Sequence, residues 1–170
     1  MKNLSLLFII IAFAITACQE SAAPVDIESE KATIKKMFAE NWVFINNIEF
    51  DSVSVDLTED VLSCGSDPSE FWNKKEIEEI WKSFTEENIP EMELIGDRIV
   101  KVAPDGQSAI VVEQVNLSYT PDIPWRTVYY LLKTNGKWMI SFMSTALIPR
   151  NEDLEAISKS VAVEEEPVEE

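Results

Sequence analysis

The chain has 170 residues, 46% of them hydrophobic, and a formal net charge of -17 at pH 7. This length suits one domain with appendages, and the charge argues against nucleic acid or an anionic membrane surface as an electrostatic partner. The sequence contains no histidine, which removes the commonest general base near neutral pH and the commonest metal ligand.

The N-terminus has the pattern of a secretory signal. Lys2 precedes an apolar run over residues 4–15, which is too short to span a bilayer comfortably. The run leads into Ile15-Thr16-Ala17-Cys18, which resembles the bacterial lipobox. The resemblance implies cleavage before Cys18 and diacylglycerol on its sulfur. An ordinary cleavable signal or an anchoring helix is the alternative.

We therefore expect residues 1–17 to be a lipoprotein signal peptide and residues 18–26 to be a tether, because that segment is small, polar and contains proline. The domain would be lipid-anchored in the bacterial cell envelope, in the periplasm or at the cell surface. If Cys18 carries lipid, Cys64 has no partner for a disulfide within the chain, and we expect it to be a buried small residue.

The next segment predicts a long amphipathic helix from about residue 27 to residues 46–47. Its apolar stripe repeats at spacings of four, four and three and consists of Ile34, Phe38, Trp42 and Ile45. Residues 50–60 fit either a strand or a short helix, because their apolar residues alternate but an aspartate near the start is a helix cap.

A short strand over residues 61–64 and a second helix over residues 69–87 follow. Ser69 is the expected cap of this helix, and Pro90 stops it. Beyond this proline the period changes to two, which predicts strands over residues 92–102 and 107–119.

The stretch from Trp125 to Leu147 predicts a central hairpin. Asn135-Gly136 is a strong signal for a two-residue turn, because both positions need positive φ. The resulting register places Leu131 opposite Ile140 and Tyr129 opposite Phe142. Neither face of this hairpin is polar, so we expect both faces to be covered. Residues 150–170 predict an acidic, disordered tail, in which 153–160 form at most a weak helix.

Several short motifs occur in a characteristic order. They are Phe50-Asp51 with Leu57 and Asp60, then Lys74-Lys75-Glu76-Ile77 with Trp81, then Asp105-Gly106-Gln107-Ser108-Ala109, then Arg126-Thr127-Val128, Asn135-Gly136-Lys137-Trp138 and Ser144. In this order the chain resembles the SnoaL-like and nuclear transport factor 2-like superfamily, which includes ketosteroid isomerase and scytalone dehydratase. Asn73 departs from the pattern, because glycine is usual there.

The resemblance implies an α+β, cystatin-like fold over residues 27–149. A strongly curved antiparallel or mixed sheet would wrap around the long N-terminal helix as a cone with a pocket at its open end. The outer face of the sheet often forms a dimer in this superfamily, so the resemblance and the apolar hairpin together predict a homodimer.

The resemblance also gives candidate site residues. Enzymes of the superfamily use a carboxylate in the cone as base, often with a tyrosine that stabilises the oxyanion. Glu113, the one carboxylate on an apolar strand face, and Tyr129 are the candidates; alternatively Glu113 is solvated or paired with Arg126 or Lys101. The expected ligand-binding residues are Phe38, Trp42, Glu113, Tyr129, Phe142 and Ser144. We expect no metal and no cofactor.

Three functions fit these observations. The favoured one is a membrane-tethered, non-catalytic domain that binds a small apolar or amphipathic molecule or an envelope protein. The second is an isomerase or dehydratase with Glu113 as base and Tyr129 as oxyanion donor. The third is a dimeric assembly module whose cone is filled by its own side chains.

Overall fold

The computed structural model describes residues 24–161, so the expected signal peptide, Cys18 and the acidic end beyond residue 161 lie outside the described part. Helix α2, Ile27–Asn46, has the bounds that the apolar stripe predicted. Asp26 caps it by accepting a hydrogen bond from the Ser29 amide, which satisfies one of the otherwise unpaired amides of the first turn. No helix in residues 24–161 is long and apolar enough to cross a membrane.

The other helices within residues 24–161 are short. They are α3 (Phe50–Ser54), α4 (Lys74–Lys82), the 3-10 helix η1 (Asn151–Asp153) and α5 (Leu154–Val161). The strands are β1 (Leu57–Cys64), β2 (Phe71–Trp72), β3 (Met92–Leu94), β4 (Ile99–Val102), β5 (Ser108–Leu117), β6 (Trp125–Thr134) and β7 (Lys137–Leu147).

Two sequence predictions are wrong in their bounds. The helix expected over residues 69–87 is only α4, because Phe71–Trp72 pair with β1 and Asn73, in a reciprocal capping box with Glu76, begins the helix in place of Ser69. The strand expected over 92–102 is divided into β3 and β4 around Gly96, whose φ is +68°. Beyond the sheet, η1 and α5 occupy residues 151–161, where the sequence allowed a weak helix over 153–160.

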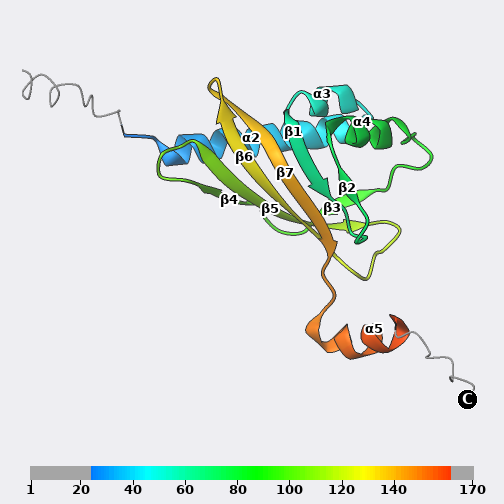
Figure 1. Ribbon diagram of the computed structural model, residues 1–170. Coiled ribbons are helices and arrows are strands. Elements are labelled where there is room, and N and C mark those ends of the chain that lie inside the picture. Colours follow the sequence, from blue (N-terminus) through cyan, green and yellow to red (C-terminus); the bar gives the residue numbers. More distant parts are fainter. Residues whose placement is uncertain (1–23, 162–170) are drawn as a thin grey trace, which may run out of the picture.

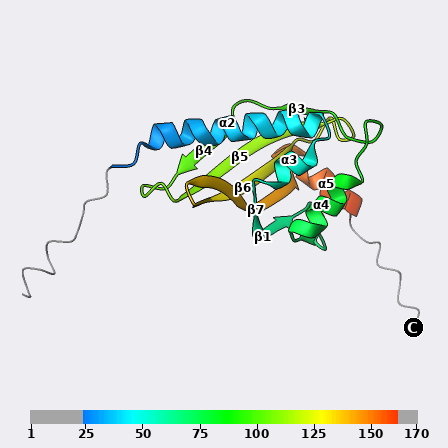
Figure 2. The ribbon, with the colours of Figure 1, turned by 90° about the horizontal axis from the view of Figure 1, so that it is seen from above.

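The sheet is curved and unclosed, and α2 lies along one of its faces (Figures 1 and 2). Its strand order is β2-β1-β7-β6-β5-β3, with β4 also paired to β5. All neighbours are antiparallel except β1 and β7, which are parallel. The mixed sheet agrees with the α+β prediction, and α3 and α4 lie beside β1 at the C-terminal end of α2 (Figure 2).

The β6–β7 hairpin has the predicted turn but not the whole predicted register. Asn135 and Gly136 both have positive φ, and Leu131 lies opposite Ile140. Beyond this pair a β-bulge shifts the register by one residue, so Tyr129 lies opposite Met143 and Tyr130 opposite Phe142. Because side chains alternate between faces, the shift moves Phe142 and Ser144 to the outer face, away from α2.

The core lies between α2 and the inner face of the sheet. Ile34 and Phe38 from the helix pack with Leu57, Val111 and Leu131 from three strands. At the N-terminal end of α2, Glu30 joins the helix to the hairpin, since its carboxylate accepts hydrogen bonds from Lys133 Nζ at 2.5 Å and Trp138 Nε1 at 2.8 Å. These contacts hold the N-terminal end of the helix against the sheet. A cavity remains near its C-terminal half.

Candidate functional site

A cavity of about 70 Å³ lies inside the fold, between the C-terminal half of α2, the inner face of the sheet, and α3 and α4. Its apolar lining comprises Phe38, Trp42, Ile45, Val53, Leu57, Trp81, Ile140 and Met143, and its polar groups belong to Asn41, Glu113 and Tyr129. An apolar enclosure with a few convergent polar groups is the usual composition of a small-molecule site. Its volume is well below the roughly 300–1,000 Å³ of such sites.

Glu113 is the buried carboxylate of this cavity, and both of its oxygens are engaged. Tyr129 Oη donates a hydrogen bond to Oε1 at 2.7 Å, and Arg98 Nε donates one to Oε2 at 2.7 Å. Glu113 reaches the inner face because it alternates with Val111 and Val115 along β5. The sequence suggested Arg126 or Lys101 as ion-pair partners; the partner is Arg98, from the segment between β3 and β4.

The Arg98 guanidinium is itself held by aromatic rings. Its Cζ atom lies 5.1 Å from the centre of the Trp42 ring and 5.9 Å from that of Phe38, both on α2. Such positions over aromatic faces favour a cation. The side chain is only 13% exposed, so the arginine and Glu113 form a largely desolvated ion pair that crosses from the sheet toward the helix.

Tyr129 is fixed as a hydrogen-bond donor to this pair. Burial, followed by the charge of Glu113 and the hydrogen bond to it, raises the pKa of the Tyr129 phenol well above its usual 10.0. The phenol ring also meets Phe38 edge to face, with 4.8 Å between ring centres. The hydroxyl therefore stays protonated at neutral pH and directs its proton to Glu113.

The structure brings together four of the residues that the sequence singled out. Phe38, Trp42, Glu113 and Tyr129 all line the interior cavity, whereas Phe142 and Ser144 lie on the outer face because of the β-bulge. That any of these residues binds a ligand remains a prediction. Sequence reasoning missed Arg98, although a buried carboxylate on an apolar strand requires a nearby cation.

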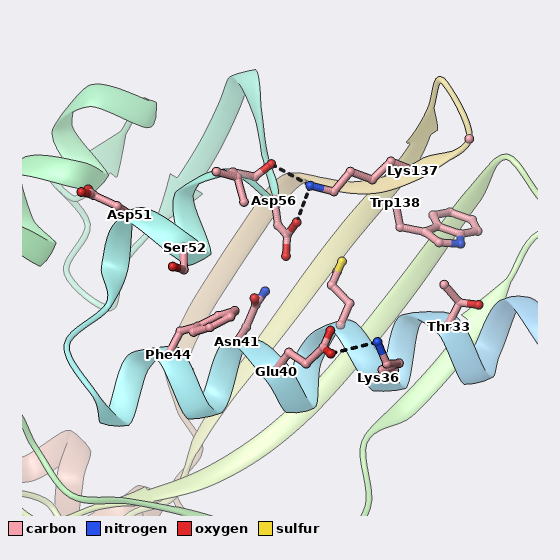
Figure 3. A pocket seen from close by; sticks show the side chains of 13 residues that line it. Thr33, Lys36, Glu40, Asn41, Phe44, Asp51, Ser52, Asp56, Lys137 and Trp138 are labelled. Carbon is pink, nitrogen blue, oxygen red and sulfur yellow. Dashed lines mark hydrogen bonds and ion pairs between the residues drawn. The ribbon is translucent and has the colours of Figure 1, made fainter.

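A second hollow, a groove of about 740 Å³, lies between α2, α3 and the tip of the β6–β7 hairpin (Figure 3). Asp56 and Asn41 point into it from opposite sides, and Lys137 pairs with Asp56 at 2.9 Å. Asn41 borders both hollows. None of the expected ligand-binding residues lines this groove.

The arrangement of an N-terminal helix along a curved, unclosed sheet is that of nuclear transport factor 2-like and cystatin-like α+β domains. A model of the SnoaL-like domain family matches residues 34–147, which is more than half of the chain. The chain therefore belongs to the SnoaL-like family, as the order of its motifs predicted. No curated protein matches it.

Solved structures with the same fold have diverged far in sequence. A nuclear transport factor 2-like protein from Cytophaga hutchinsonii is 17% identical, with a TM-score of 0.57 over 69% of this chain and 98% of its own. A cystatin-like fold protein from Burkholderia xenovorans is 14% identical, with a TM-score of 0.60 over 72% and 94%. A ketosteroid isomerase-like protein from Erwinia carotovora atroseptica is 19% identical, with a TM-score of 0.51 over 70% and 96%. These likenesses establish the fold alone.

Proposed function

We propose that this chain is a non-catalytic SnoaL-like binding domain, held in the bacterial cell envelope by lipid on Cys18, that takes a small amphipathic molecule into its interior cavity. The observation that carries the proposal is the engagement of Glu113 by Arg98 and Tyr129. These three residues place one polar group within an apolar lining, which suits a ligand with an apolar body and one polar end.

The same geometry argues against proton abstraction. A general base needs to meet the proton that it removes, within about 3 Å. Here both carboxylate oxygens of Glu113 already accept hydrogen bonds, and Tyr129 gives its proton to this carboxylate rather than to a substrate oxygen. Catalysis would require both of these hydrogen bonds to be exchanged for contacts with a substrate.

Native mass spectrometry of the full chain in detergent tests the binding role. We expect a co-purifying small molecule that is lost from Tyr129→Phe, which removes one hydroxyl from the cavity. Tyr130→Phe is the matched control, because Tyr130 lies on the outer face of the same strand, and it should retain the molecule. A chain that carries no molecule, or equal retention by both variants, contradicts the proposal.

An isomerase or dehydratase activity is the second candidate. The observation that favours it is that Tyr129 Oη and Glu113 Oε1 lie 2.7 Å apart inside one cavity. An oxyanion donor and a base that act on one small substrate need to lie close together in this way. Incubation of the co-purifying molecule in D₂O distinguishes the two roles. If the molecule gains deuterium with the wild-type chain but not with Glu113→Gln, the chain is a catalyst. If the molecule gains no deuterium with either chain, the result supports binding.

We also propose that two copies associate through the outer face of the sheet, which would leave the interior cavity of each copy intact. Ile110, Tyr130, Phe142 and Leu62 lie side by side there across β5, β6, β7 and β1, and three of them are exposed. Light scattering should give the mass of a dimer for the full chain. Ile110→Lys should give a monomer, and Val43→Lys, a like change at an exposed site on α2, should not.

An assembly module with a filled cone is the third candidate, favoured by the small interior volume. It predicts the same dimer but no bound molecule. The lipid anchor is tested separately: Cys18→Ala should move the protein from the membrane fraction to the soluble fraction and remove the mass of the acyl groups. Retention in the membrane fraction would contradict the anchor alone.

A further inference from the structure

The groove between α2, α3 and the hairpin tip differs from the interior cavity in size and in polarity. Its volume of about 740 Å³ is within the range of sites that hold drug-sized molecules. Met37, Phe44, Val55 and Trp138 give it an apolar surface. It opens on the side of α2 where the hairpin tip and α3 approach the helix (Figure 3).

One polar group in the lining of the groove is a buried acceptor without a donor in residues 24–161. The Asn41 side chain is buried at 5% exposure, and its Oδ1 atom has no hydrogen-bond partner in the described part of the chain. A buried acceptor without a partner is costly, so it marks a position that an occupant can satisfy. Asn41 lines the groove, so its side-chain amide is within reach of an occupant.

Asp56 faces Asn41 across the groove (Figure 3). Its side chain is 11% exposed, whereas Lys137, which pairs with its Oδ1 atom, is 54% exposed. The carboxylate is thus the buried member of this pair, and the lysine is the solvent-exposed member. Within residues 24–161 no second donor reaches the carboxylate, so it has capacity for another cation.

The charges around the groove favour the same kind of occupant. Its lining has three carboxylates, Glu40, Asp51 and Asp56, and two lysines, and both lysines are already paired, Lys36 with Glu40 and Lys137 with Asp56. The chain as a whole has a net charge of -17. A strongly acidic protein concentrates cations near its surface and repels anions.

We propose that this groove is a second binding site, specific for an amphipathic organic amine. The protonated nitrogen lies between Asp56 and Asn41 Oδ1, where it donates charge-assisted hydrogen bonds, and the apolar body lies against Met37 and Phe44. The groove shares Asn41 with the interior cavity but has its own charged and apolar lining, so it neither requires nor replaces the binding proposed there.

Calorimetric titration of the full chain in detergent with three probes of one shape tests the proposal. The probes are 2-phenylethylamine, 2-phenylethanol and 3-phenylpropionate, which are a cation, a neutral molecule and an anion at pH 7. We expect the amine to bind about tenfold or more tightly than either other probe, because hydrogen bonds to charged groups are the strong ones. Equal affinity for the three probes overturns the proposal.

Two variants with opposite expected effects locate the site. Asp56→Asn should weaken amine binding about tenfold, whereas Lys137→Met should strengthen it, because the amine no longer competes with the lysine. Asp60→Asn makes the same charge change at an exposed carboxylate outside the groove and should have little effect. Tyr129→Phe, which alters only the interior cavity, should leave the amine affinity unchanged.

The opposite signs keep the test decisive even if Asp56→Asn folds poorly. Weaker or unchanged binding by Lys137→Met, or a loss of amine binding in Tyr129→Phe, overturns the proposal. A loss of amine binding in Tyr129→Phe would place the amine in the interior cavity, so it would support the binding function proposed above and not the groove site.

Discussion

The contact between Glu30 and the hairpin should contribute strongly to the stability of the domain. The carboxylate accepts from Lys133 Nζ and Trp138 Nε1, and the ammonium lies 5.5 Å from the centre of the Trp138 ring. Glu30 is 20% exposed and Lys133 21%. Glu30→Gln places an amide where two donors converge, and since hydrogen bonds to charged groups contribute about 1.5–3 kcal/mol, we expect a loss of about 2 kcal/mol.

Glu28→Gln is the matched control. Glu28 is on the same helix, 83% exposed, and pairs with Lys31 at 2.8 Å, so its loss should cost about 0–1 kcal/mol. By thermal unfolding, about 2–4 °C per kcal/mol for a domain of this size gives a decrease of about 6 °C for Glu30→Gln. If the two variants are destabilised equally, the contact of Glu30 with Lys133 and Trp138 contributes no more to stability than a surface ion pair.

The pH dependence gives an independent check. Hydrogen bonds from Lys133 and Trp138 hold the pKa of Glu30 below its usual 4.5. A depressed pKa stabilises the fold above the unfolded-state value, and that contribution is lost as the pH falls through the folded-state value. The stability difference between wild type and Glu30→Gln should therefore be constant above pH 4.5 and narrow below it. A difference that persists in full at more acidic pH would refute this reasoning.

Three further substitutions test the fold and the site by urea denaturation. Arg98→Met should lower the free energy of unfolding by about 3–5 kcal/mol, because it leaves Glu113 buried without its cation. The double variant Arg98→Met/Glu113→Leu should recover much of this loss. No recovery would contradict the ion-pair explanation. Gly136→Ala should cost about 1 kcal/mol, because φ there is +80°, and an unchanged midpoint would contradict the turn. Asn73→Ala should cost about 1 kcal/mol as a lost helix cap, whereas Ser69→Ala should be nearly silent; equal effects would contradict the capping box.

Local signals in the sequence were sufficient for the two main elements. The apolar stripe from Ile34 to Ile45 lies within a helix of 20 residues, and the turn at Asn135-Gly136 needs a backbone conformation that few other residue pairs adopt. Both therefore follow from neighbours in the chain. The order of short motifs then identified the family and, with it, the curved sheet around the helix.

The errors arise where contacts between distant segments decide the structure. The bulge near Ser141 has no strong local signal, yet a shift of one residue moved Phe142 and Ser144 to the wrong face. Pairing of Phe71–Trp72 with β1 shortened α4 in the same way. Arg98 lies 15 residues from Glu113, and no period or motif in the sequence joins them.

The parallel pairing of β1 with β7 has a consequence for the order of folding. Residues 57–64 follow α2 and α3, but their long partner in the sheet is β7, residues 137–147. A nascent chain that has not yet produced β7 can pair only the end of β1, with the two residues of β2, so most of β1 remains an unpaired strand edge, which invites aggregation or proteolysis. Premature termination anywhere before residue 137 should therefore yield a product that is degraded rather than a smaller stable domain.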